Sequence, residues 1–461
     1  MQPIRWTFPV RLMLVTISAG LGILSFPPVG LSACSLIFLL PFLIALRGAS
    51  PQQSIGLGAL MGFSLYLGTL NWMVTIFGGF ALFLHAVLTL FPMLFTGLWA
   101  TLALPNRAWA PWIAATLWTG FEYYRCEWSP LRFAWITPGT GLPPGYLTPL
   151  LGVYGITFLI AAACAAIAFS PRQRLLGVIL LGSIALCTWL PKPSTPNPTL
   201  KVAAIQSEEM STFALLHRSK DLPPVDAIVW PEYATTTDLR QNTALRIELQ
   251  KLLDLKSAQV LVLGGRADRE NGTWENTAFT LGRDTLLGTH VKNRPVHFFD
   301  DGQPGTQAPA ISTPLGQIAT PICFDNDGDA VVRRAVANGA EFLLIPSMDA
   351  ESWTARQHRQ HAALFRHRAA ENARWLVVAA SSGLTQVVDP WGRRVDSLPL
   401  FEPGNLVAEI APSRRRTPYQ LGGWLIGPLC CVFTAATLVF AVYQSRRNLS
   451  SPTAPAEGPT G

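Results

Sequence analysis

The stretch "DAIVWPEYA" (226–234) places four apolar residues directly before a proline and a glutamate. The apolar run has the length and the β-branched and aromatic content of a short buried strand. Pro231 ends such a strand because proline has no backbone N–H to donate to a sheet. The segment therefore predicts a strand whose end presents the carboxylate of Glu232.

Residues 199–410 continue this pattern outward on both sides, with strand-like and helix-like segments in alternation. Strands are predicted at "LKVAAIQ" (200–206), "QVLVLGG" (259–265), "GQIATPICF" (316–324) and "EFLLIP" (341–346), helices at "ALRIELQKLLDLKS" (244–257) and residues 354–374, and a hairpin at "LTQVVDPWG" (384–392). Alternation of this kind predicts a layered α/β domain.

The rest of the chain has the composition of a membrane protein. The sequence is 49% hydrophobic and only 14% charged, and its long apolar runs lie in residues 1–195 and 421–444. A helix needs about 20 mostly apolar residues to cross a bilayer. Eight candidate spans follow, at about 12–28, 31–47, 54–76, 80–103, 108–122, 146–170, 174–191 and 421–444.

This division predicts three parts: a bundle of about seven helices (1–195), a catalytic α/β domain (196–412), and an eighth helix with a polar, proline-rich tail (413–461), which we expect to be disordered. The first apolar run is interpreted as a retained anchor, because another run follows it at once. "LSAC" (31–34) has the form of a lipoprotein cleavage site, but the apolar run that continues from it favours a spanning helix.

The net charge of +7 is better explained by membrane topology than by nucleic acid, since no basic stripe is interleaved with aromatic residues. The positive-inside rule places the arginines that flank the spans in the cytoplasm: Arg5, Arg11, Arg47, Arg107, Arg172, Arg174, Arg446 and Arg447. Seven crossings then place residues 192–420 on the periplasmic face of a bacterial inner membrane.

Three side chains could form a catalytic group in the α/β domain. Cys323 is its one cysteine. A thiol attacks as thiolate, so Glu232 could accept its proton while Lys292 and the backbone N–H of Phe324 stabilise the oxyanion formed on a carbonyl. Each residue alone is more typical of core or surface. Together, each beside a strand end, they predict a site on one edge of a sheet.

Other polar residues are given weaker functional interpretations. Glu122 and His85, in apolar runs, are candidates for substrate contact or for structural bridges. His358, His361 and His367 lie on one helix among arginines, which disfavours a metal site. "LGGRAD" (263–268) lacks the ending of a phosphate-binding loop. We expect no cofactor, no metal and no disulfide.

The motifs resemble a known family. "VWPE" (229–232), the Lys292 segment and "ICFD" (322–325) resemble the Glu–Lys–Cys motifs of the nitrilase, or carbon–nitrogen hydrolase, superfamily. "LWTGFEYYR" (117–125) and "RRTPYQLGGW" (415–424) look like stretches of the apolipoprotein N-acyltransferase family. The resemblance implies a multi-pass α-helical membrane bundle joined to a nitrilase-like αββα sandwich.

The resemblance also implies a reaction. The family moves an acyl chain from a membrane phospholipid, through a cysteine thioester, to the N-terminal amine of a diacylglyceryl-cysteine lipoprotein. Glu232 would be the general base, Lys292 the oxyanion stabiliser and Cys323 the nucleophile. Asp300 and Asp325 match the positions of two supporting glutamates, and Phe324 stands where the family usually has tyrosine.

Two other functions remain open on the sequence. A membrane-anchored amidase would use the same three residues with water as acceptor, and the short segment between Lys292 and Cys323 slightly favours it. An inactive binding scaffold would suit the altered residues around the site.

Overall fold

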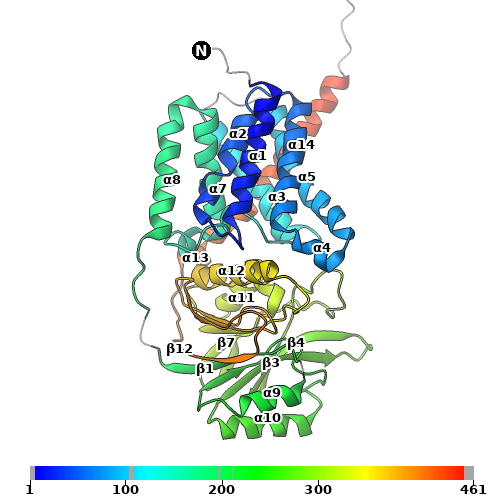
Figure 1. Cartoon of the computed structure of the whole chain (residues 1–461), viewed down its shortest axis with the longest axis vertical. Coiled ribbons are helices and arrows are strands. Elements are labelled where there is room, and N and C mark those ends of the chain that lie inside the picture. Colours follow the sequence, from blue (N-terminus) through cyan, green and yellow to red (C-terminus); the bar gives the residue numbers. More distant parts are fainter. Residues whose placement is uncertain (1–5, 103–107, 196–197, 210, 451–461) are drawn as a thin grey trace, which may run out of the picture.

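The structure is a computed structural model that describes residues 6–102, 108–195, 198–209 and 211–450, without the side chains of 445–450. It consists of an apolar helical bundle above a two-sheet sandwich (Figure 1). The predictions made for Arg5, Arg107 and the tail from 451 lie outside the described residues.

The bundle gathers the apolar runs of both ends of the chain. Its helices are α1 (Phe8–Ser25), α2 (Leu39–Ala45), α3 (Pro51–Thr69), α4 (Trp72–Phe77), α5 (Phe80–Leu102), α6 (Ala110–Tyr123), α7 (Thr148–Phe169), α8 (Arg174–Trp189) and α14 (Ile426–Ser450), with a 3₁₀ turn at Ser32–Leu36 and a π turn at Tyr124–Trp128. Among the described residues four helical segments are long and apolar enough to cross a membrane: Phe8–Ser25, Phe80–Leu102, Thr148–Phe169 and Gly423–Gln444.

Two of the expected spans are not single long helices. The run at 54–76 is divided into α3 and α4, and the run at 31–47 forms the 3₁₀ turn and the short α2. His85 explains the first break, because its ring nitrogens lie 2.5 Å from the carbonyl oxygen of Ala81 and 3.3 Å from that of Leu70, between α3 and α4. Apolar composition alone does not reveal such breaks, so the count of eight spans stays a prediction.

The sandwich contains two six-stranded sheets. The first has the order β12-β1-β2-β3-β4-β5 and the second β11-β10-β9-β8-β7-β6. The first sheet contains β1 (Leu200–Gln206), β2 (Ala227–Val229), β3 (Val260–Asp268), β4 (Trp274–Gly282), β5 (Leu286–Val291) and β12 (Gly404–Ile410). The second contains β6 (Ile311–Thr313), β7 (Gly316–Ala319), β8 (Phe342–Pro346), β9 (Leu376–Ala379), β10 (Gln386–Val388) and β11 (Arg394–Ser397).

Helices cover the outer face of each sheet, which gives four layers. α9 (Thr212–Ser219) and α10 (Thr243–Leu255) cover the first sheet, while α11 (Ala330–Ala337) and α12 (Ala355–Asn372) cover the second and face the bundle (Figure 1). β1 has apolar side chains on both faces at its centre. Val202 and Ala204 pack between the sheets, and Ala203 and Ile205 pack under α9 and α10, because successive side chains of a strand point to opposite faces.

Buried hydrogen bonds fix the sandwich to the bundle. Gln360 on α12 donates to the carbonyl oxygens of Pro27 (3.0 Å) and Thr69 (2.9 Å) and accepts a hydrogen bond from Trp72 (2.9 Å). Glu127, in the π turn after α6, forms an ion pair with Arg294 of the sandwich. Buried polar groups that lose such partners carry a large desolvation cost, so these contacts hold the two units in one orientation.

The close contact of Gly120 with α14 allows the packing of the bundle to be tested. A Cβ on Gly120 of α6 would lie 2.5 Å from the carbonyl oxygen of Cys430 on α14 and would also meet Thr434, whereas a Cβ on Gly182 of α8 would meet nothing within 4 Å. We expect Gly120→Ala to destabilise the protein by about 1–3 kcal/mol, since overpacking forces the backbone to shift. Thermal unfolding in detergent measures this, with Gly182→Ala as the matched control. Equal stability of the two variants would contradict the close packing of α6 on α14.

Candidate active site

Glu232 lies where β2 ends, as its sequence segment predicts. Its backbone N–H donates to the carbonyl oxygen of Ser347 (3.4 Å). The segment lies directly against β3, because a Cβ on Gly264 would come within 2.5 Å of the Glu232 Cα. Glycine is therefore required at position 264 for the carboxylate to reach the site.

Lys292 follows β5 and is only 1% exposed. Its Nζ donates to Glu232 Oε1 (2.8 Å) and to Asp301 Oδ2 (2.7 Å). Asn276 Nδ2 donates to the same two carboxylates, at 2.6 Å each. Burial works against the ammonium, but Glu232 and Asp301 outweigh it and raise the pKa of Lys292 well above its usual value. Lys292 is therefore a permanent buried cation.

One carboxylate oxygen of Glu232 remains free to accept a proton. Burial raises the pKa of Glu232 by more than Lys292 lowers it, so the carboxylate is a stronger base than one in water. Its Oε2 is buried and has no hydrogen-bond partner among the described residues. A general base needs an oxygen that is free to take a proton, and Oε2 meets that requirement.

The aspartate that supports Lys292 is Asp301, and Asp300 does not lie in this position. Asp300 is exposed, whereas Asp301 contacts Lys292 and also accepts hydrogen bonds from Tyr233 and from the backbone N–H of Val296 (2.6 Å). The sequence contains two adjacent aspartates. Comparison with the family by position along the chain selected Asp300 instead of Asp301. The turn before them decides which one points inward.

Cys323 begins a 3₁₀ turn (Cys323–Asn326) with a φ of +44°, which is unusual for a residue with a side chain. The thiol is almost fully buried and lies 3.5 Å from the carbonyl oxygen of Met348. Burial raises the pKa of Cys323 well above its usual value; Glu232 acts in the same direction and Lys292 in the opposite one. The resting sulfur is therefore a neutral thiol, and the site needs its base at the moment of attack.

The three residues do not share one sheet edge, which corrects the sequence-based expectation. Glu232 and Lys292 follow β2 and β5 of the first sheet, but Cys323 follows β7 of the second. They come together because the two sheets stack face to face. The sequence shows where strands end but does not show which sheet each strand joins.

Asp325 connects the Lys292 segment to the cysteine turn. Its Oδ1 accepts the backbone N–H groups of Asn293 (2.9 Å) and Arg294 (2.8 Å), and its Oδ2 lies 3.1 Å from the backbone nitrogen of Ile322 and 2.8 Å from His290 Nε2. This carboxylate sets the spacing of cation and nucleophile without lining the pocket. Phe324, in contrast, lines the pocket.

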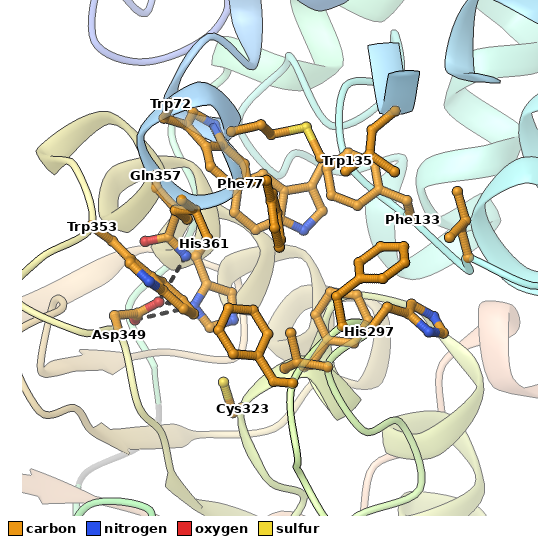
Figure 2. A pocket seen from close by; sticks show the side chains of 18 of the residues that line it. Trp72, Phe77, Phe133, Trp135, His297, Cys323, Asp349, Trp353, Gln357 and His361 are labelled. Carbon is orange, nitrogen blue, oxygen red and sulfur yellow. Dashed lines mark hydrogen bonds and ion pairs between the residues drawn. The ribbon is translucent and has the colours of Figure 1, made fainter. Parts of the chain in front are cut away.

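The thiol of Cys323 faces an apolar pocket with an empty volume of about 770 Å³ (Figure 2). Its walls come from both units: Trp72, Phe77, Leu84 and Leu88 of the bundle, Phe133 and Trp135 of the loop after α6, and Phe298, Phe299 and Trp353 of the sandwich. Glu122 and His85 are not among the lining residues. Glu122 pairs with Arg125 instead, so both of these residues have structural explanations.

Asp349 and His361 form a pair beside the pocket that the sequence analysis did not predict. His361 Nδ1 lies 2.8 Å from Asp349 Oδ1, and its ring stacks on Trp135 at the pocket (Figure 2). Although burial opposes it, the carboxylates of Asp349 and Asp327 raise the pKa of His361 to about 10. Among the described residues no group of three or more His, Cys, Asp or Glu side chains could hold a metal ion. His361 forms an ion pair with Asp349 instead.

The neighbouring aspartates provide a matched test. Asp301→Asn removes one partner of a buried cation, and breaking a buried pair typically costs about 3 kcal/mol or more. Asp300→Asn changes an exposed side chain and should leave stability unchanged. We expect a clearly lower thermal midpoint for Asp301→Asn alone. A midpoint that falls in the Asp300 variant instead would reverse the assignment.

The protonation state of Cys323 can be tested by alkylation. Because the thiol pKa is raised above its ordinary value of 9.0, the thiolate fraction is small at neutral pH and grows as pH rises. The rate of iodoacetamide labelling at Cys323, followed by peptide mass mapping, should keep increasing above pH 9. A plateau near neutral pH would mean that the resting sulfur is already a thiolate.

Comparison with known proteins agrees with this architecture. A family model described as the apolipoprotein N-acyltransferase N-terminal domain matches residues 18–166, and one described as carbon–nitrogen hydrolase matches residues 183–419. The apolipoprotein N-acyltransferase of Vibrio vulnificus is 27% identical over 93% of this chain and 96% of its own length. That of Geobacter metallireducens is 26% identical over 95% of each chain.

Among solved structures, Saccharomyces cerevisiae Nit3 of the nitrilase superfamily aligns with 50% of this chain and 97% of its own, at 19% identity and a TM-score of 0.41. The carbon–nitrogen hydrolase match covers the sandwich with its three strand-end residues, and the N-terminal match covers most of the bundle. The chain therefore belongs to the carbon–nitrogen hydrolase family, as a membrane-bound N-acyltransferase of the apolipoprotein N-acyltransferase type.

Proposed function

We propose that this N-acyltransferase moves an acyl chain from a membrane phospholipid to the N-terminal amine of a diacylglyceryl-cysteine lipoprotein, with Cys323 as the carrier. The observation that carries the proposal is the pocket above the thiol. Its walls include α4 and α5 of the apolar bundle, so a lipid chain can reach the sulfur without leaving an apolar environment.

The first half of the reaction loads the cysteine. Glu232 Oε2 takes the thiol proton as Sγ attacks the ester carbonyl of the donor, and Lys292 stabilises the oxyanion together with the backbone N–H of Phe324. The C–O bond of the ester then breaks. The departing lysophospholipid oxygen takes the proton from Glu232, and the acyl chain remains on Cys323 as a thioester.

The second half of the reaction transfers the acyl chain from Cys323 to the acceptor. The lipoprotein amine attacks the thioester carbonyl, Glu232 takes a proton from that nitrogen, and the C–S bond breaks. The proton returns to the sulfur, which restores the neutral thiol. The apolar walls keep water from competing with the amine, which is what separates transfer from hydrolysis.

The charge distribution supports a periplasmic site in the bacterial inner membrane. Arg11, in the first turn of α1, donates to the carbonyl oxygens of Ala45 and Arg47, at 2.9 Å for the latter, and α1 begins at the end of the bundle remote from the sandwich (Figure 1). Positive residues favour the cytoplasmic side. The sandwich, at the other end, would then face the periplasm, where lipoprotein amines are exposed.

An anchored amidase would use the same residues on a small soluble amide. A single helix is enough for anchoring, and it would not require bundle residues in the wall of the catalytic pocket. The partner-free oxygen of Glu232 and the base it provides argue against an inactive scaffold. Neither alternative explains the shared pocket.

Acyl loading can be measured directly. Incubation of the purified protein with phospholipid vesicles should add the mass of one acyl chain in intact-mass measurement. Cys323→Ala should show no adduct, and Glu232→Gln should load at least about 100-fold more slowly, the scale of a lost general base. Cys187→Ala, which removes a free and partly exposed thiol on α8, is the matched control and should load normally.

Addition of a diacylglyceryl-cysteine peptide with a free amine should then remove the adduct much faster than buffer does. An adduct that persists in Cys323→Ala would overturn the role of this residue. Absence of any adduct in the wild-type protein, together with hydrolysis of small amides, would favour the amidase.

A further inference from the structure

A second hollow lies on the other side of Trp135 from the catalytic pocket, and Trp135 lines both. Its empty volume is about 700 Å³. It is formed by the loop after α1, by residues 136–144 and by α12. Its walls combine apolar residues such as Phe26, Leu142 and Leu364 with small and polar residues such as Ser25, Gly30 and Thr140.

Two basic side chains of α12 face this hollow, and no Asp or Glu is among its lining residues. Arg366 uses Nε to donate to the carbonyl oxygen of Gly392 (2.9 Å), and no carboxylate among the described residues forms an ion pair with it. His367 is almost fully buried, and its Nδ1 has no hydrogen-bond partner among the described residues. Burial and the neighbouring Arg368 and Arg366 lower the pKa of His367 to about 3, so its ring is neutral and its free Nδ1 accepts a hydrogen bond instead of donating one. The guanidinium without an ion pair suits an anionic oxygen, and the ring nitrogen suits a hydroxyl of the same ligand.

Further positive charge surrounds Arg366. Arg393 donates to the carbonyl oxygen of Lys192 (3.3 Å) in the segment after α8. Asp389 pairs with Arg393 at 2.6 Å. Burial and the nearby Arg394 lower the pKa of Arg366 to about 10, although Asp389 acts in the opposite direction. An anion bound here would relieve that repulsion.

The rim of the hollow suits a lipid surface. Val29 and Leu31, on either side of the lining residue Gly30, are 51% and 54% exposed. Trp189 and Leu190, just before Lys192, are also exposed. Exposed apolar side chains next to cations are typical of protein that lies at the boundary of acyl chains and headgroups.

We propose that this hollow is a second lipid site, in which Arg366 binds the phosphate of a phospholipid headgroup and the Nδ1 of His367 accepts a hydrogen bond from a headgroup hydroxyl. Headgroup binding at this hollow is separate from acyl transfer, because it needs no thioester on Cys323. Trp135 lines both this hollow and the pocket of Cys323, where Figure 2 shows its side chain. The group that binds is a phosphate. The exposed apolar side chains at the rim favour a membrane phospholipid as the molecule that carries it.

Binding can be tested without catalysis in the full chain that carries Cys323→Ala. Dihexanoyl phosphatidylglycerol is titrated in detergent, and binding is followed by native mass spectrometry. We expect Arg366→Gln to weaken binding about tenfold, the scale of a lost charge-assisted contact. Arg359→Gln, an exposed arginine of the same helix, should bind as the parent does.

Two further ligands show whether the site recognises the phosphate of a lipid or free phosphate. Dihexanoylglycerol, which lacks the phosphate, should bind at least about tenfold more weakly. Inorganic phosphate should bind weakly and compete only at high concentration. Equal binding of dihexanoylglycerol would overturn the headgroup assignment, and phosphate binding as tight as that of the lipid would overturn the lipid source.

A second variant protects the test against misfolding. His367→Gln removes the ring and keeps α12 free of new charge, and thermal unfolding checks each variant before titration. Loss of binding in either folded variant supports the site, and full binding in both overturns it. Since Cys323→Ala cannot form a thioester, failure of headgroup binding and failure of acyl loading are separate results.

Discussion

The buried ammonium of Lys292, shared between two carboxylates, is the interaction on which the rest of the site depends. Removing three charged groups from water is expensive, and the cost is offset only when every remaining donor and acceptor is satisfied. Asn276, Tyr233 and the backbone of Val296 supply those contacts. Two oxygens of this cluster lack a partner among the described residues, Asn276 Oδ1 and Glu232 Oε2, and Glu232 Oε2 is the one that the proposed chemistry uses.

This arrangement explains why Cys323 rests as a neutral thiol. Lys292 favours a thiolate, but Glu232 and Asp301 already neutralise its charge, and burial disfavours a new anion. In the proposed reaction the thiolate therefore forms only as the proton moves to Glu232 and as a carbonyl arrives to receive the sulfur.

The bundle contributes more than attachment to a membrane. It supplies walls of the pocket over Cys323, and its Glu127 holds the sandwich through Arg294 and the backbone N–H of Asp329 (3.0 Å). Arg294 lies two residues after the catalytic lysine, and Asp329 precedes α11, which follows the cysteine turn. The membrane part and the catalytic part are therefore joined at the segments that carry the chemistry.

The sequence by itself determined several of the strands, the apolar segments and the three candidate residues that follow strands, because these depend on local properties: hydrophobic periodicity, proline and the rarity of a cysteine. It did not predict β5, β6, β11 or β12, and the strand predicted at 316–324 ends at Ala319. Only the tertiary structure decided the rest. It selected Asp301 over Asp300, placed Cys323 on the second sheet, divided the apolar run at 54–76 into α3 and α4, and brought Asp349 and His361 together beside the pocket. Each of these outcomes depends on which distant surfaces pack against one another, and that choice follows from the free energy of the whole fold, which no short segment contains.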